Sequence, residues 1–225
     1  MTTAAGYPGL GSVWRFPGVY APQTDTRLLA RALQAERITA GMEVLDVCTG
    51  CGALALLAAR MGARVSAVDI SRRAVATARV NAIRDGHRIR VRRGDLSVPW
   101  DRTFDVVVSN PPYVPAEQAL PPARGRARAW DAGPDGRHVI DRVCAHAPSL
   151  LGPQGVLLMV HSGLCGARTT LRQLTGAGLR CSVLYRVRVP FGPVLTARLP
   201  WLRAQGLVGP ADDTEELVVI RAERC

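Results

Sequence analysis

The stretch Val44-Leu45-Asp46-Val47-Cys48-Thr49-Gly50-Cys51-Gly52-Ala53 decides the expected fold of this chain. An apolar run ends in acidic Asp46 and its neighbour, a turn with two glycines follows, and small Ala53 opens the next apolar segment. A strand–turn–helix of this kind brings backbone N–H groups close to a ligand. Cys48 stands where most such turns have glycine, and we expect it to serve there on the condition that its backbone does not need a positive φ.

The two cysteines of this stretch also form a C-x-x-C motif, which has two other interpretations. A structural zinc site needs two more ligands at a recognisable spacing, but the remaining cysteines are isolated and the four histidines form no H-x-x-x-H pair. A thioredoxin-like redox pair would suit a helix start after a strand. The neighbouring Asp46, Gly50, Gly52 and Ala53 favour a ligand-binding turn instead, and we expect no metal.

The rest of the chain alternates between strand-like runs and helical patterns. The runs cover 43–47, 64–69, 88–94, 104–109, 155–161, 179–189 and 215–222, and the helical patterns cover 53–61, 71–85, 137–151 and 167–177, after a first helix capped by Thr24 or Asp25 that runs through Arg37. Strands separated by helices need crossover connections, which predicts an α/β fold with a seven-stranded, mostly parallel sheet and helices on both faces. Residues 190–213 lack a strong helical period, so we expect an antiparallel last strand that follows an insertion.

Length and composition favour one domain. With 225 residues, 48% of them hydrophobic, the chain can bury one substantial core. We expect a single domain over 1–225, with an N-terminal segment and helix over 1–40, a cofactor-binding and catalytic core over 41–165, and the insertion over 190–213. No signal sequence opens the chain and no apolar run approaches the roughly 20 residues of a membrane helix, so we expect a cytoplasmic, membrane-free protein with reduced thiols.

The charge of the chain allows two interpretations. Its net charge is +11, and all 29 basic residues are arginine. Such a balance suits acidic partners such as RNA or the ribosome. Codon bias in a GC-rich genome explains the same composition, and the two interpretations stay open.

Three acidic residues close consecutive strand-like runs: Asp46, Asp69 and Asp95. Because ligands of open α/β sheets bind at the carboxyl ends of the strands, these carboxylates should meet in one crevice, where Asp69 can accept both ribose hydroxyls. The turn lacks the G-x-G-x-x-G spacing suited to a pyrophosphate, and a chain without lysine has no Walker lysine. A nucleoside without phosphates fits better, and S-adenosylmethionine is such a ligand.

The fourth run ends in Ser109-Asn110-Pro111-Pro112-Tyr113. Two prolines fix the backbone and remove two N–H donors, so the loop presents carbonyl oxygens. An amide or exocyclic amine could donate its two N–H bonds to the Asn110 side chain and a proline carbonyl, while Tyr113 stacks on the planar group. These dipoles would stabilise the positive charge that grows on a nitrogen attacking a sulfonium. A simple turn after a strand is the alternative.

These motifs resemble those of the HemK-type, S-adenosylmethionine-dependent methyltransferases. Val19-Tyr20-Ala21-Pro22 with Asp25-Thr26 and Leu28-Leu29, and the segment from Ala129 to Arg137, resemble the short subgroup that methylates a glutamine of class I release factors in eukaryotes and archaea. The resemblance implies a Rossmann-like class I methyltransferase fold, with Asn110, Pro111, Pro112 and Tyr113 orienting the substrate. It also implies cofactor contacts at Thr26, Asp46, Cys48, Gly50, Asp69, Asp95, Leu96 and Asn110.

Besides Cys48, which stands where these relatives usually carry glycine, two further features depart from that family. Short relatives work with a small zinc-binding activator along the edge of the third strand, but Arg88-Ile89-Arg90-Val91-Arg92-Arg93 makes that edge highly charged, and charged edges resist pairing. We therefore expect no activator subunit. The insertion 190–213 exceeds what the short subgroup carries; it forms either a lid or partner surface or a satellite hydrophobic cluster, and we favour the cluster.

The expected function is N-methylation of a planar amide, with a protein glutamine as the first choice of acceptor and a release-factor-like protein as the partner. The alternative is an exocyclic amine of rRNA, tRNA or DNA, adenine N6 or guanine N2, which Arg124, Arg126 and Arg128 after the Asn110 loop would support. Few aromatic residues accompany these arginines, which counts against it. A small-molecule amine and a non-catalytic, cofactor-sensing module that binds nucleic acid are weaker alternatives.

Overall fold

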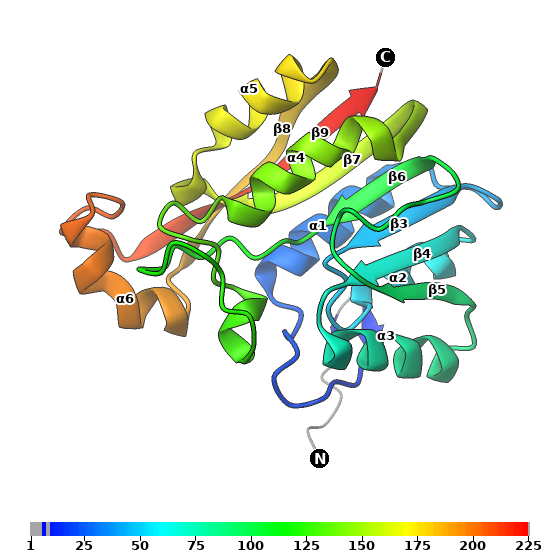
Figure 1. Ribbon diagram of the computed structural model, residues 1–225, viewed down its shortest axis with the longest axis horizontal. Coiled ribbons are helices and arrows are strands. Elements are labelled where there is room, and N and C mark those ends of the chain that lie inside the picture. Colours follow the sequence, from blue (N-terminus) through cyan, green and yellow to red (C-terminus); the bar gives the residue numbers. More distant parts are fainter. Residues whose placement is uncertain (1–5, 8–9, 225) are drawn as a thin grey trace.

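A computed structural model describes residues 6–7 and 10–224 of the chain, and its central feature is one seven-stranded sheet (Figure 1). The strands follow the order β5-β4-β3-β6-β7-β9-β8. Their bounds are β3 Glu43–Val47, β4 Arg64–Asp69, β5 Ile89–Arg93, β6 Phe104–Ser109, β7 Leu151–Ser162, β8 Leu179–Pro190 and β9 Thr214–Arg224. Strands β3 to β7 pair in parallel, and β9 pairs antiparallel with both β7 and β8. The predicted α/β class and antiparallel last strand are confirmed.

Helices cover both faces of this sheet because its strands are apolar on both sides. Along β6, Val106 and Val108 join the core on the α1, α2 and α3 face, whereas Val107 joins the core on the α4 and α5 face. The bounds are α1 Thr24–Ala35, α2 Ala53–Arg60, α3 Arg72–Arg84, α4 His138–Leu150 and α5 Ala167–Gly176. A short ribbon, β1 Gly6–Tyr7 with β2 Gly11–Ser12, and two 3-10 turns, η1 Arg126–Ala129 and η2 Gly163–Cys165, complete this part.

Three details differ from the sequence-based expectation. The cap of α1 is Gln23, without a side-chain cap hydrogen bond, so the predicted cap at Thr24 or Asp25 is wrong. Strand β7 begins at Leu151 rather than at 155, because Leu151 pairs with Phe104 across an irregularity in the ladder. The third difference is helix α6, Pro193–Ala204, inside the connection from β8 to β9, where no helix was expected.

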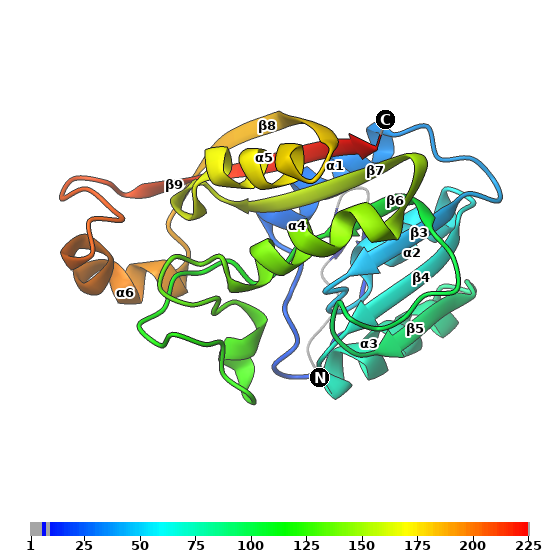
Figure 2. The ribbon, with the colours of Figure 1, turned by 45° about the horizontal axis from the view of Figure 1, so that its top comes forward.

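The prolines of α6 hid it from sequence analysis. One proline stands at its first position, where a helix tolerates proline, and Pro200 lies in its second half. Its apolar residues form a small core of their own with Leu195, Leu202 and Val208 buried, separate from the two cores of the sheet. Figure 2 shows α6 beyond the ends of β8 and β9, away from the other helices.

No helix among residues 6–7 and 10–224 combines the length and apolar character needed to cross a membrane.

Candidate active site

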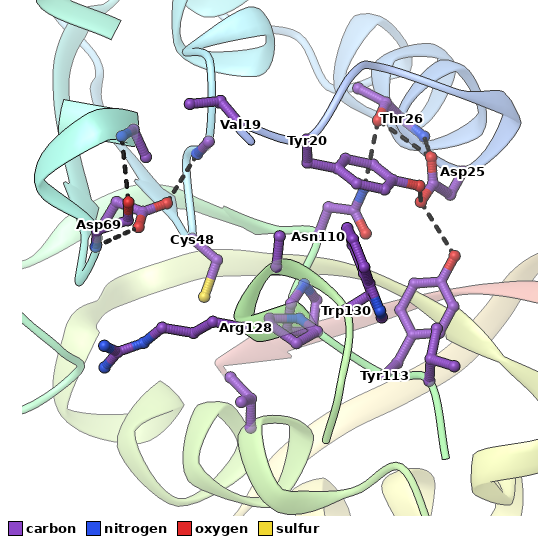
Figure 3. Close-up of a pocket in the computed structure, with 18 of the residues that line it drawn as sticks. Val19, Tyr20, Asp25, Thr26, Cys48, Asp69, Asn110, Tyr113, Arg128 and Trp130 are labelled. Atoms are coloured by element: carbon purple, nitrogen blue, oxygen red, sulfur yellow. Dashed lines mark hydrogen bonds between the residues drawn. The ribbon is translucent and has the colours of Figure 1, made fainter. Parts of the chain in front are cut away.

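A cavity of about 900 Å³ opens at the carboxyl ends of β3, β4 and β6, where the topology brings the turn after β3 and the loop after β6 together (Figure 3). All of the residues predicted for the site line it. They are Thr26, Asp46, Cys48, Gly50, Asp69, Asp95, Leu96, Asn110, Pro111, Pro112 and Tyr113. In Figure 3 the labelled side chains fall into two groups, with Asp69 and Cys48 at one end and Tyr20, Asp25, Tyr113 and Trp130 at the other.

The turn after β3 is built on left-handed backbone conformations. Gly50 has φ 56° and Gly52 has φ 84°, and a Cβ at Gly52 would lie 3.1 Å from the Ala78 Cβ. Cys48 also has a positive φ, 60°, so the condition under which cysteine was expected to replace glycine is not met. A non-glycine residue in this region costs about 1–2 kcal/mol. The cavity therefore has a strained residue in the turn after β3.

Cys48 and Cys51 do not form a disulfide. Burial raises the pKa of both thiols, to about 11 for Cys51, and the carboxylates of Asp69 and Asp46 raise that of Cys48 further. Reactive cysteines have lowered rather than raised pKa values. This environment agrees with a ligand-binding turn and not with a redox pair, and no metal-binding cluster of His, Cys, Asp or Glu occurs among the described residues.

Asp46 is the most deeply buried acid of the site, with 1% of its surface exposed. Its Oδ2 atom accepts hydrogen bonds from the Thr49 hydroxyl (2.6 Å) and the Ala55 N–H (3.0 Å). Its Oδ1 atom has no hydrogen-bond partner among the described residues. Burial raises the pKa of Asp46 to about 7. A buried acceptor without a partner in a cavity wall is a place where a ligand can donate.

Asp69, at the end of β4, holds the turn after β3. Its Oδ2 atom accepts the Gly50 N–H (2.9 Å) and its Oδ1 atom accepts the Ser71 N–H (2.8 Å). Burial raises the pKa of Asp69, and the Arg128 guanidinium counteracts this. Because each carboxylate oxygen can accept two hydrogen bonds, both oxygens keep capacity for a pair of hydroxyls.

Asp95 follows β5 and is tied to helix α4. Its Oδ1 atom accepts from the Ser97 hydroxyl (2.6 Å), and its Oδ2 atom accepts from Nη2 of Arg142 (2.7 Å). These bonds hold the pKa of Asp95 well below its usual range. Arg142, which also lines the cavity, was not predicted; its position four residues into α4 gave no signal.

The Asn110 side chain is oriented by the first turn of α1. Its Nδ2 atom donates to Oγ1 of Thr26 (3.2 Å), and that hydroxyl donates in turn to Oδ1 of Asp25 (3.1 Å). The Oδ1 atom of Asn110 is thereby left to accept from a ligand. Thr26 was predicted to contact the cofactor; in the structure its hydroxyl bonds to Asn110 and Asp25.

Asp25 connects the two tyrosines at the far end of the cavity. It is 2% exposed, and its Oδ2 atom accepts from the hydroxyls of Tyr20 (2.8 Å) and Tyr113 (3.0 Å), as Figure 3 shows. Burial and the Asp25 charge raise the pKa of both tyrosines, so their hydroxyls remain protonated donors. Asp25 was expected to cap a helix. The sequence signal that could have shown its role was the position of Asp25 in the first turn of a predicted helix, five residues after Tyr20.

Comparisons with known proteins agree with this geometry. The E. cuniculi Mtq2–Trm112 complex, described as responsible for methylation of the eRF1 termination factor, has a chain that shares the fold with a TM-score of 0.63 and 24% identity, over 92% of this chain and 99% of that one. The architecture is that of the Rossmann-like class I methyltransferases. The model of the methyltransferase small domain matches residues 11–123, and the chain belongs to that family.

Two relatives are named for glutamine methylation. A protein of Methanocaldococcus jannaschii, named a protein N5-glutamine methyltransferase, is 32% identical over 78% of this chain and 88% of its own length. A ribosomal protein uL3 glutamine methyltransferase of Bradyrhizobium diazoefficiens is 45% identical over 53% of this chain. The chain covers 40% of that bacterial relative, so only part of the bacterial protein is compared.

Proposed function

We propose that this chain uses S-adenosylmethionine to methylate the side-chain amide nitrogen of a protein glutamine, with a release-factor-like protein as substrate. The observation that carries this proposal is the Asn110–Thr26 hydrogen bond. It fixes the orientation of the Asn110 side chain, so that its Oδ1 atom can accept a hydrogen bond in the same cavity as Asp46 and Asp69. The names of the relatives support glutamine as the acceptor.

The cofactor end fits a cationic nucleoside. Asp46 offers an unpaired buried oxygen to the positively charged methionine part, Asp69 has capacity for the ribose hydroxyls, and Leu96 provides an apolar wall for the base. Gly50 and Cys48 would bring the backbone close to the ligand. When bound, S-adenosylmethionine supplies an electrophilic methyl group on a sulfonium.

The acceptor end would then hold the amide in one orientation. Oδ1 of Asn110 and the Pro111 carbonyl would each accept one N–H of the substrate amide, which aims its nitrogen lone pair away from them. Positive charge growing on that nitrogen would be stabilised by these fixed dipoles without reorganisation. Tyr113, held by Asp25, would lie against the planar group, and the apolar surroundings would exclude water from it.

An exocyclic amine of a nucleic acid is the second candidate because arginines surround the cavity. Arg15, Arg126 and Arg128 line it, and Arg73 approaches Gly18 on the same rim. Guanidinium groups in this position would suit phosphates. The same chemistry at Asn110 would serve adenine N6 or guanine N2.

One experiment separates these candidates. The protein is incubated with methyl-labelled S-adenosylmethionine and, in parallel, with an intact release factor, ribosomal protein uL3, total RNA and DNA. We expect label in a glutamine of the release factor, lost when that glutamine is replaced by glutamate. Label in uL3 would change the substrate but not the chemistry. Label only in nucleosides, or none at all, would contradict the proposal.

Two variants test the assigned roles. Asn110→Ala should abolish transfer while S-adenosylmethionine still binds, because the amide orients the acceptor. Asp69→Ala should weaken cofactor binding itself. Full turnover by Asn110→Ala would show that the assigned mechanism is wrong.

We also propose that the protein works without a zinc-binding activator. Strand β5 lies at the sheet edge, and its arginines are engaged within the chain: Arg92 donates to the Pro99 carbonyl (2.8 Å) and lies 5.0 Å from the centre of the Trp100 ring, and Arg90 pairs with Asp101 (3.6 Å). An edge covered in this way resists strand addition. Gel filtration of the protein expressed alone should give a monomer that binds S-adenosylmethionine; aggregates that are rescued by a co-expressed small zinc protein would contradict this.

A further inference from the structure

Residues 191–213, the connection between β8 and β9, form an ordered unit at the acceptor end of the cavity. The unit is closed at its base, where the Phe191 N–H donates to the Asp213 carbonyl (3.1 Å). Helix α6 packs its buried Leu195 and Leu202 against Val208. The first turn of the helix, Pro193 to Leu195, lines the same cavity as Asn110. In Figures 1 and 2 the helix lies beside the long loop that follows β6.

That loop carries two aromatic residues of the cavity on two paired segments. Val114 and Asp131 form an isolated parallel bridge. The Val114 N–H donates to the Trp130 carbonyl (2.7 Å), and the Ala132 N–H donates to the Val114 carbonyl (3.0 Å). Tyr113 therefore directly precedes Val114, and Trp130 directly precedes Asp131, the two residues that form the bridge. The separation of the two rings depends on how firmly these short segments are paired.

Arg198 of α6 joins both segments at once. Its Nη1 atom donates to the Pro115 carbonyl (2.8 Å), and its Nη2 atom lies 2.7 Å from Oδ1 of Asp131. The Arg198 side chain is 25% exposed and that of Asp131 only 7%, so the ion pair is largely shielded from water. The rigid fork of donors on a planar guanidinium lets Nη1 donate to the Pro115 carbonyl while Nη2 stays in ion-pair contact with Asp131, whose Oδ1 atom accepts no hydrogen bond from the described residues. A lysine ammonium is a compact charge on a flexible stem and lacks this fixed geometry.

We propose that α6 is the acceptor-side wall of the active site and that Arg198 is a positioning residue, which holds the Tyr113 and Trp130 segments in register for the substrate. This inference rests on the proposed function and adds a determinant of acceptor selection to it. The first turn of α6 presents apolar surface and no charge to the cavity. The acceptor segment that meets this wall is therefore uncharged next to its glutamine.

Three variants test the role of Arg198. Arg198→Ala should raise the KM for the glutamine acceptor about tenfold, the effect expected when one partner of a shielded ion pair is removed, and leave the Kd for S-adenosylmethionine within about twofold. Arg198→Lys should give an acceptor KM between those of the wild type and Arg198→Ala, because the ammonium keeps a positive charge beside Asp131 but lacks the rigid fork of donors. The matched control is Arg203→Ala, an exposed arginine further along the same helix, which should behave as wild type.

A second readout does not need turnover. Hydrogen exchange at the Val114 and Ala132 amides should accelerate in Arg198→Ala and much less in Arg198→Lys, while the amides of β3 keep their protection. Thermal unfolding monitors global folding, and Arg198→Gln replaces the alanine variant if that one does not fold.

The outcomes separate the two proposals. Unchanged acceptor KM and unchanged exchange in Arg198→Ala, with normal transfer by the wild type, would overturn the role of Arg198 and leave the proposed function intact. A wild type that transfers no methyl group to any glutamine protein would overturn the proposed function, and the exchange experiment would still decide whether Arg198 holds the loop. A proportional loss of cofactor binding and turnover in Arg198→Ala would mean a purely structural role and also counts against the inference.

Discussion

Oγ1 of Thr26 lies 3.2 Å from Nδ2 of Asn110, although the two residues are 84 positions apart in the chain. The first turn of α1 thereby sets the orientation of the amide at the end of β6. Thr26→Val, which keeps the shape but removes the hydroxyl, should lower kcat about tenfold, the effect of leaving one buried donor unpaired. Methyl transfer measured under saturating cofactor checks this. Thr26→Ser should retain most activity, and equal rates for both variants would contradict the assignment.

Cys48 should tolerate glycine better than any branched residue. A residue with a side chain pays about 1–2 kcal/mol for the φ of 60° at this position, and glycine does not. Glycine loses more conformational entropy on folding, however, which cancels part of this gain. We expect Cys48→Gly to lie within about 1 kcal/mol of wild type in the free energy of unfolding, and Cys48→Val to lose about 2 kcal/mol or more. Urea unfolding measures both. A more stable valine variant would show that the backbone at this position is not strained.

Cofactor affinity should rise with pH because of Asp46. Burial raises its pKa to about 7, so the carboxyl is mostly neutral below that pH and ionised above it. A positively charged cofactor binds the ionised form better, and the Kd should fall about tenfold between about pH 6 and about pH 8. Calorimetric titration across this range tests the sign. Asp46→Asn should bind more weakly and flatten the profile; an unchanged profile in this variant would assign the effect to another group.

His161 should make the fold sensitive to acid. It is fully buried, with its Nδ1 atom 2.8 Å from the Ser162 carbonyl and its Nε2 atom 3.1 Å from the Thr170 hydroxyl, and burial lowers its pKa from 6.5 to about 4. Arg137, which donates to the same Thr170 hydroxyl, opposes a second positive charge there.

The unfolded state takes up a proton below pH 6.5 while the folded state does not, so stability falls as the pH drops from 6.5 towards 4. The loss attributable to His161 should reach about 2.5 kcal/mol at about pH 4.5. Urea unfolding at about pH 7 and about pH 4.5 should show a smaller drop in His161→Gln than in the wild type. Equal drops would mean that other groups carry the acid sensitivity.

Local sequence patterns were sufficient for the class of the sheet and for the strand-end acids that line the cavity. Asp46 and Asp69 end apolar runs, and parallel strands bring their carboxyl ends to one edge whatever the remaining packing is. These features depend on residues close in sequence or on rules that hold for all such sheets.

The acceptor end depends on contacts that no local pattern encodes. Tyr113 and Asp25 are 88 positions apart, and no pattern in either segment predicts the hydrogen bond between them. Asp25 has the residue type of a helix cap, which concealed its role. Cys48 was expected to replace glycine only if its backbone did not need a positive φ. Its φ is in fact positive, which the residue type alone did not predict because residues with side chains disfavour this conformation. Helix α6 was missed because Pro193 and Pro200 conceal its helical pattern.

The long hairpin of β8 and β9 places α6 at its tip, whereas the strand-end acids of the cavity, Asp46, Asp69 and Asp95, lie on or just after β3, β4 and β5. If α6 is the acceptor-side wall that we propose, a change in that tip should alter which acceptor is methylated and leave the strand-end acids of the cavity unchanged. Grafting 191–213 onto a related enzyme should then transfer the acceptor preference from one scaffold to another.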